Sequence, residues 1–437
     1  ETHARVIDRV RREAEALSKP VGILFDLQGP KIRIGDFDGP TREVLAGEEF
    51  TIAVGRPHKP DEIPADHPLL DRDVEAGDPL LIDDGQLSTE VISVEEGRVR
   101  CRAVDAGTIA PRKGINLPSS HVSAPAVTEK DHRDALFALA QGVDAIALSF
   151  VRRARDVRDL ERIIKGEGGS IPIISKIEKP QALEELDEIL EASWGVMVAR
   201  GDLGVELSPE EVPMAQKRII SEAMARGRPV ITATQMLESM TRNPRPTRAE
   251  ASDVANAVLD GTDAVMLSQE TATGDHAVES VRMMARIVRH TESFHRRPAM
   301  RRRRELSFST IPDAVVDAGC QVAHHLNTHA IVAFTRSGMT ALLAARRRPD
   351  RPILAFTTSP KVWRRLSLVW GVRPYKMRKV STTDALIAEL DAVIHSDRLA
   401  RKGDPLVLLM GAPTHKLGRT NLMHVYRVGY WAPLEKG

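Results

Sequence analysis

The sequence has 437 residues, more than one ordinary domain needs, so two or three domains are expected. A net charge of +1 gives no overall field that would draw the chain to nucleic acid or to an acidic membrane. No apolar run approaches the ~18 residues of a membrane span, and two distant cysteines, Cys101 and Cys320, favour a reducing cytoplasmic location over a disulfide-rich secreted one.

The chain opens in an amphipathic helical pattern, with Val6, Ile7 and Val10 on one side, and continues into an apolar strand at 21–27. Because residue 1 is glutamate and the pattern begins inside a helix, we expect further chain upstream.

Residues 34–118 differ from the preceding segment in composition and in predicted secondary structure. They are rich in Gly, Pro and Asp, and they hold short β-like runs at 48–54, 79–83 and 98–104 without a long helical pattern. This stretch predicts a small all-β domain inserted in a loop.

Strand and helix patterns then alternate. The predicted strands lie at 144–150, 171–178, 195–199, 229–234 and 263–268. Helix starts are indicated by capping pairs at Thr128 and Asp131, Ser208 and Glu211, and Thr247 and Glu250. Continuous apolar strands that alternate with amphipathic helices predict a parallel sheet covered on both sides, and several units in series favour a barrel. The barrel domain would comprise residues 1–33 and 119–296.

A third body is predicted at 297–437, an α/β domain. Its strands are expected at 330–335, 352–357, 372–375, 405–410 and 424–428. The arginine-rich stretch at 295–304 is interpreted as an exposed linker, since the total charge is near zero and nucleic-acid binding is not expected.

Polar residues collect where the predicted barrel strands end, which is where such barrels carry their catalytic groups. Lys176 and Glu178 share one face of a strand, and Asp202 follows the next strand. Two carboxylates on adjacent strand ends suit a magnesium ion that keeps other positions for water or substrate oxygens. A neighbouring lysine suits phosphoryl transfer, although a plain buried ion pair stays open as the alternative.

Further candidates lie at other strand ends: Asp26, Thr234, Ser268 and Glu270. The glycines in the turn at 199–204 allow backbone N–H groups to face an anion. Taken alone, Thr234 also fits an ordinary strand threonine, and the turn fits an ordinary strand-to-helix connection.

At this point the residues resemble a known family, pyruvate kinase. The motifs are KGINLP (113–118), ISKIEKP (174–180), MVARGDLGVEL (197–207) and the long run ITATQML…QETATG (231–274). The resemblance extends from residue 1 to about residue 428. It implies a (β/α)8-type barrel, an inserted β-barrel lid and a C-terminal α/β domain.

The resemblance implies transfer of a phosphoryl group from phosphoenolpyruvate to ADP, giving pyruvate and ATP. Lys176 matches the lysine that stabilises the moving phosphoryl group, and Glu178 and Asp202 match the ligands of Mg2+ or Mn2+. The segment that receives the substrate carboxylate corresponds to Ala199, Arg200, Gly201 and Asp202.

Other family roles fall on single positions. Thr234 matches a substrate-contacting threonine near the enolate carbon, and Ser268 and Glu270 match a pair placed behind it. The residues expected to face the nucleotide and metal from the lid side are Arg33, Lys113 and Asp84.

Three departures from the family pattern stand out. Lys31 replaces the glutamate of potassium-dependent members, and Leu27 replaces a frequent threonine, so potassium is not expected to be required. Gln269 replaces a glycine. The first two barrel strands, with an arginine, an asparagine and a serine of the site, precede residue 1 in the family pattern, so we expect this sequence to be part of a longer product rather than a degenerate relative.

In the C-terminal domain, a loop after a strand holds Thr335, Ser337, Gly338 and Thr340, groups that can cradle a phosphate. The resemblance implies a phosphosugar or nucleotide effector there and a homotetramer, while a loop without a ligand stays open. Two rival functions also remain at this stage. They are a metal-dependent, enolate-forming lyase on a related barrel and a catalytically impaired, regulatory relative.

Overall fold

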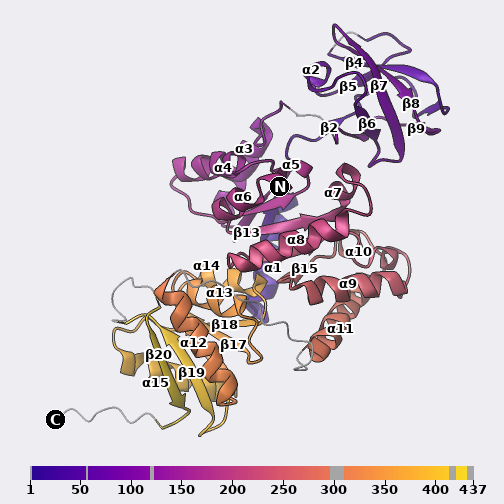
Figure 1. The fold of residues 1–437 in the computed structure, drawn as a ribbon. Helices are drawn as coiled ribbons and strands as arrows, with labels where there is room; N and C mark the ends of the chain where they lie inside the picture. Colours follow the sequence, from indigo (N-terminus) through magenta and orange to yellow (C-terminus); the bar gives the residue numbers. More distant parts are fainter. Residues whose placement is uncertain (1, 56–57, 119–122, 296–309, 413–419, 431–437) are drawn as a thin grey trace.

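The computed structural model describes residues 2–55, 58–118, 123–295, 310–412 and 420–430. Figure 1 shows three bodies in a row: a β domain at one end, a helix-covered sheet in the middle and an α/β domain at the other end. The predicted basic linker lies outside the described residues beyond position 295. Within the described ranges, no helix is long and apolar enough to cross a bilayer.

The middle body is built on a six-stranded parallel sheet in the order β1-β11-β12-β13-β14-β15. Its strands are β1 (Leu24–Asp26), β11 (Ala145–Leu148), β12 (Ile173–Ile177), β13 (Gly195–Ala199), β14 (Val230–Ala233) and β15 (Ala264–Val265). The four central strands are almost wholly buried, as expected where helices cover a parallel sheet. The predicted strands of this part are therefore confirmed.

Helices pack against this sheet. They are α1 (Thr2–Ala16), α3 (Glu129–Ala140), α4 (Ala154–Gly166), α5 (Pro180–Glu184), α6 (Leu186–Ala192), α7 (Arg200–Glu206), α8 (Val212–Ala225), the 3-10 helix η1 (Glu238–Thr241), α9 (Arg248–Asp260), α10 (Gln269–Ala272) and α11 (Ala277–His295). The capping boxes at Thr128 and Thr247 are confirmed.

The helix start predicted at Ser208 is wrong. Its hydroxyl does donate to the Glu211 carboxylate at 2.7 Å, but in a turn before the helix, and α8 begins only at Val212. Pro213 lies at the second helical position and has no N–H to bond residue 209, so the helical ladder cannot extend back to Ser208.

The lid, residues 32–118, is a separate β domain. It has a seven-stranded sheet in the order β2-β10-β6-β7-β8-β4-β5 and a two-stranded β3-β9 pair. Its elements are β2 (Ile32–Arg33), β3 (Arg42–Val44), β4 (Glu49–Val54), β5 (Ile63–Ala65), α2 (Leu70–Asp73), β6 (Pro79–Ile82), β7 (Leu87–Glu95), β8 (Arg98–Ala103), β9 (Gly107–Ile109) and β10 (Gly114–Asn116). Because β2 pairs with β10, the lid sheet starts two residues before position 34.

One buried carboxylate holds both connections between the lid and the sheet. Asp131 Oδ1 accepts the Gly29 N–H at 3.1 Å, where the chain leaves β1. Its Oδ2 accepts the Thr128 N–H at 3.0 Å, where α3 begins. Gly29 has a φ of +70°, and a Cβ there would lie 2.8 Å from the Phe150 ring, so this exit needs glycine.

The C-terminal body has a five-stranded sheet in the order β18-β17-β16-β19-β20, with only β20 antiparallel. Its elements are α12 (Ile311–His325), β16 (Ala330–Phe334), α13 (Met339–Arg346), β17 (Ile353–Thr357), α14 (Pro360–Arg365), the 3-10 helix η3 (Leu366–Leu368), β18 (Val372–Lys376), α15 (Thr383–Ser396), β19 (Pro405–Met410) and β20 (Leu422–Arg427). All five predicted strands are confirmed.

Candidate active site

Lys176 and Glu178 meet at the carboxyl end of β12, where Lys176 Nζ lies 3.0 Å from Glu178 Oε1. The ammonium also donates to Ser149 Oγ at 2.8 Å and to Asp26 Oδ2 at 3.2 Å. Asp26 ends β1 and Ser149 follows β11, so three adjacent strands supply this cluster. The sequence analysis placed Asp26 at a strand end but missed Ser149. Ser149 comes directly after the apolar run of β11, and this position could have identified it.

Burial and charge set the protonation of this cluster. Burial raises the pKa of Glu178 to about 7; Lys176 opposes this change and Asp202 adds to it. Burial alone would lower the pKa of Lys176, but the Glu178 and Asp26 carboxylates outweigh it and raise that pKa above its usual value. Lys176 therefore stays charged at neutral pH, whereas the pKa of Glu178 lies close to neutral pH.

The carboxylates fit a hard divalent cation. Glu178 Oε2 accepts the Phe150 N–H at 2.6 Å, whereas the buried Oε1 has its ion pair with Lys176 but no well-aligned hydrogen bond. Asp202 lies in the first turn of α7 with its side chain 28% exposed. The described residues hold no group of three or more potential metal ligands among His, Cys, Asp and Glu. A two-carboxylate set suits Mg2+, which usually keeps waters and binds substrate oxygens.

Thr234 follows β14 and faces the turn that carries Asp202. Its Oγ1 accepts the Gly201 N–H at 2.7 Å and donates to Ala233 O at 2.7 Å. Thr234 and Gln235 have φ values of +65° and +52°, a left-handed backbone that non-glycine residues rarely adopt. Gly201 and Thr234, two separately predicted site residues, are thus in contact.

The Arg200 side chain contacts the backbone on the other side of Thr234. It is buried, and it bonds to backbone carbonyls at 233–235 and to the Asp253 carboxylate. In the turn itself, Ala199 caps α7, and the backbone of 199–202 leads directly from β13 into the helix.

Ser268 and Glu270 follow β15 at the outer side of the sheet. The buried Glu270 carboxylate accepts the N–H groups of Leu237 at 3.0 Å and Ser268 at 2.6 Å, so it ties the loop after β14 to the loop after β15. The Ser268 hydroxyl is buried and has no hydrogen-bond partner among the described residues. Gln269 is the first residue of the short helix α10.

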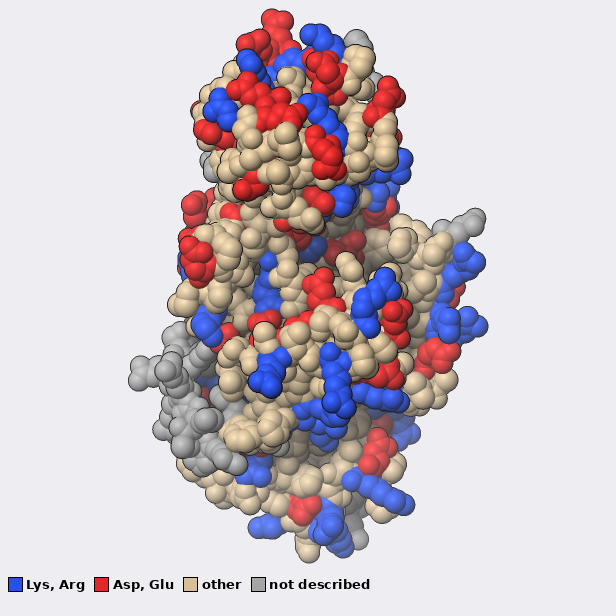
Figure 2. Space-filling model, turned by 90° about the vertical axis from the view of Figure 1, so that its right-hand side faces the viewer, with Lys and Arg blue, Asp and Glu red and all other residues tan. Residues whose placement is uncertain are grey.

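The lid supplies charged groups across a hollow that Figure 2 shows between the lid and the middle body. Lys31 Nζ lies 3.8 Å from Asp84 Oδ1 and 3.9 Å from Asp202 Oδ1, so it stands between the lid and a candidate metal ligand. Lys113 pairs instead with Asp83 at 2.9 Å. Arg33 donates to Arg112 O at 2.9 Å, which holds its side chain against the lid backbone.

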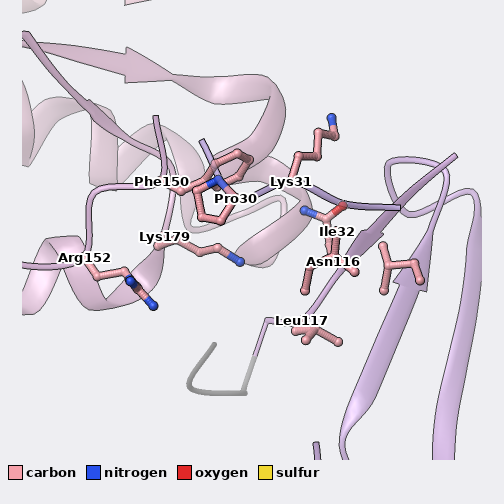
Figure 3. A pocket seen from close by; sticks show the side chains of 9 residues that line it. Pro30, Lys31, Ile32, Asn116, Leu117, Phe150, Arg152 and Lys179 are labelled. Carbon is pink, nitrogen blue, oxygen red and sulfur yellow. The ribbon is translucent and has the colours of Figure 1, made fainter. Parts of the chain in front are cut away.

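A small pocket lies where the lid meets the sheet (Figure 3). Its lining residues are Pro30, Lys31, Ile32, Ile115, Asn116, Leu117, Phe150, Arg152 and Lys179. Beside it, the buried Glu206 carboxylate accepts from Asn116 Nδ2 at 2.9 Å and from Lys179 Nζ at 2.5 Å. This three-residue contact joins β10 of the lid to the ends of β12 and α7.

The predicted phosphate loop of the C-terminal domain lies between β16 and α13. Gly338, with a φ of +96°, caps α13, and its N–H donates to Thr335 Oγ1 at 2.9 Å. Thr340 Oγ1 lies 2.8 Å from Thr420 Oγ1, and Ser337 is exposed. The Ser337 hydroxyl accepts the Met339 N–H at 3.4 Å, so the loop presents one exposed hydroxyl at the start of α13.

Comparison with known proteins gives consistent matches. Residues 1–281 match the family model described as "Pyruvate kinase, barrel domain", and residues 313–426 match "Pyruvate kinase, alpha/beta domain". The chain is 44% identical over 432 residues to a pyruvate kinase of Geobacillus stearothermophilus, covering 98% of this chain and 73% of that relative.

Two further matches agree. A Mycobacterium tuberculosis pyruvate kinase is 43% identical over 98% of this chain and 90% of its own length. The crystal structure of a pyruvate kinase from Cryptosporidium parvum has a TM-score of 0.89 and 36% identity, covering 98% of this chain and 88% of that one.

Proposed function

This chain belongs to the pyruvate kinase family, and from that premise we propose a role for each group at the strand ends. The chain is a phosphotransferase that moves the phosphoryl group of phosphoenolpyruvate to ADP and yields pyruvate and ATP, the last step of glycolysis. The assignment of its active site rests on one observation, the ion pair of half-buried Lys176 with buried Glu178, 3.0 Å apart at a strand end.

Glu178 and Asp202 are proposed as the protein ligands of Mg2+, or of Mn2+ in its place. The family is generally magnesium-dependent, and this assignment is supported by the buried Glu178 Oε1, which pairs with Lys176 but accepts no well-aligned hydrogen bond. A cation held there would offset the charge of the phosphoryl and enolate oxygens.

Lys176 is proposed to stabilise the phosphoryl group in transit. In this step the bond between the phosphorus and the enol oxygen breaks, the phosphoryl group joins an oxygen of the ADP β-phosphate, and the electron pair stays on the enolate. The ammonium is held by Glu178, Asp26 and Ser149, so it is already oriented when the charge moves.

The enolate must then gain a proton at its terminal carbon to become pyruvate. We place the substrate carboxylate at the 199–202 turn; the Gly201 N–H of this turn contacts Thr234 Oγ1, so the enolate carbon comes toward Thr234. Ser268, whose buried hydroxyl has no hydrogen-bond partner within the described part of the chain, and Glu270 would stand behind Thr234 and pass the proton on.

The lid would complete the nucleotide side. Arg33, Lys113 and Asp84 are proposed to approach the nucleotide phosphates and the metal when the lid closes. Closure excludes water, which would otherwise accept the phosphoryl group in place of ADP.

A coupled assay tests this function. Phosphoenolpyruvate, ADP and Mg2+ are expected to give equal amounts of ATP and pyruvate, followed through lactate dehydrogenase and the loss of NADH. Carbon–carbon cleavage of a keto acid without ADP would support the lyase instead, and ligand binding without turnover would support a regulatory relative.

Lys31 is proposed to take the place of a potassium ion, because its ammonium lies within 4 Å of both Asp84 and Asp202. Activity without a monovalent cation is expected to stay close to its value with potassium. Lys31→Glu removes this charge and is expected to make turnover depend on potassium by about tenfold or more. Strong potassium activation of the unmodified chain in the same assay would contradict the assignment.

The remaining proposals concern the effector loop, the assembly and the location of the protein. We propose that Thr335, Ser337, Gly338 and Thr340 receive the phosphate of a phosphosugar or nucleotide effector, since the Gly338 turn opens the N-terminus of α13. A homotetramer and a cytoplasmic location are likewise proposed from the family resemblance.

A further inference from the structure

Arg200 holds the backbone behind Thr234. Its Nη2 donates to Thr234 O at 2.6 Å and to Gln235 O at 3.3 Å, and its Nε donates to Ala233 O at 3.3 Å. Three consecutive carbonyl groups, from the last residue of β14 to Gln235, therefore accept hydrogen bonds from one guanidinium. Arg200 is only 8% exposed, so water offers these carbonyls little competition.

This backbone needs such support. Thr234 is β-branched and has a φ of +65°, and Gln235 follows with +52°. Residues of this kind rarely enter the left-handed region, and they remain there only when their surroundings hold them. In this conformation Thr234 Oγ1 reaches the Gly201 N–H at 2.7 Å, on the turn that carries Asp202.

Asp253 of α9 fixes the guanidinium from the other side. Its two oxygens lie 2.7 Å and 2.6 Å from Arg200 Nη1, and Gln216 Oε1 lies 3.4 Å from the same nitrogen. All three guanidinium nitrogens are thus used. A lysine has one nitrogen and cannot reproduce this fork, so an Arg-to-Lys change is not conservative here.

We infer that Arg200, oriented by Asp253, is a positioning residue for the proton-transfer half of the reaction. It keeps Thr234 in the left-handed conformation and so aims the Thr234 hydroxyl at the enolate carbon. The inference rests on the role proposed for Thr234. Because the Arg200 side chain is engaged in this way, residue 200 would contact the substrate carboxylate only through its backbone.

Exchange of the pyruvate methyl protons in deuterium oxide, followed by proton NMR with Mg2+ and ATP, isolates this half of the reaction. Arg200→Lys is expected to slow the exchange by about tenfold to a hundredfold, because the hydroxyl is displaced. The KM for phosphoenolpyruvate is expected to change little. Arg226→Lys is the control, since Arg226 follows the last residue of α8 and pairs with Glu222 of that helix, with the Glu222 carbonyl and with Asp187 of α6.

A double-mutant cycle separates positioning from general stabilisation. In a Thr234→Ala background, Arg200→Lys is expected to slow the exchange no further. The same loss in both backgrounds would overturn the inference, and unchanged exchange in Thr234→Ala alone would overturn the role of Thr234 as well. If thermal melting shows that Arg200→Lys does not fold, the same cycle is run with Asp253→Asn, which keeps the side-chain shape and must give the same non-additivity.

Discussion

Replacement of Lys176 by methionine is expected to lower kcat by about a thousandfold or more. Methionine keeps the length and packing of the side chain but removes the charge, so the loss reports on electrostatics. The Lys176 ammonium contacts Glu178, Asp26 and Ser149 and stays protonated at neutral pH. The initial rate at saturating phosphoenolpyruvate and ADP gives kcat directly.

Lys165→Met is the matched control for this change. Lys165 lies on the exposed side of α4 in an ion pair with Glu161, and its loss is expected to leave kcat unchanged. A Lys176→Met variant that retains more than about a tenth of the original kcat would show that this ammonium does not stabilise the transferring group.

Replacement of Glu178 by glutamine is expected to weaken Mg2+ binding by about a hundredfold, because one of only two proposed anionic ligands becomes neutral. The amide oxygen can still accept the Phe150 N–H, which the carboxylate accepts at 2.6 Å, so the fold should persist. Calorimetric titration with Mg2+, or with Mn2+, measures the change.

The pH dependence of this binding has a definite sign. Burial raises the pKa of Glu178 to about 7, so a proton competes with the cation once the pH falls below that value. In the unmodified chain, Mg2+ affinity is expected to fall by about tenfold per pH unit below pH 7 and to level off above it. Glu178→Gln should remove this dependence.

Glu188→Gln, on the exposed side of α6, provides the control for both measurements. Its affinity for Mg2+ and its pH profile are expected to match those of the unmodified chain. Equal Mg2+ affinity in the Glu178→Gln variant would mean that the cation is held elsewhere.

The centre of the site follows from the sequence for a simple physical reason. Parallel strands put their carboxyl ends at one edge, so polar residues directly after buried strands must meet there. This rule placed Asp202 near Lys176 and Glu178, which share one face of a single strand, and it gave Gly201 and Thr234 as separate candidates. It applied equally to Ser149, but a single serine after a strand carries no pattern of its own and was missed.

Other features depend on distances that no local pattern contains. The left-handed backbone at Thr234 could not be predicted, because no glycine occupies that position. The direction of the Arg200 side chain depends on Asp253, which lies 53 positions further along the chain. The helix start predicted at Ser208 is wrong because Pro213, further along, lacks the N–H that a helix begun at Ser208 would need, and α8 begins only at Val212. Sequence patterns thus placed elements well and side-chain directions poorly.

The carboxylate of Asp131 has a consequence for the chain entropy of the whole molecule. It joins Gly29 to Thr128, so the intervening lid is a loop whose two ends are fastened at one point. The entropy of closing a loop grows only with the logarithm of its length. The length of the inserted lid therefore adds little to the entropic cost of folding the sheet, because one carboxylate holds both ends of the insertion.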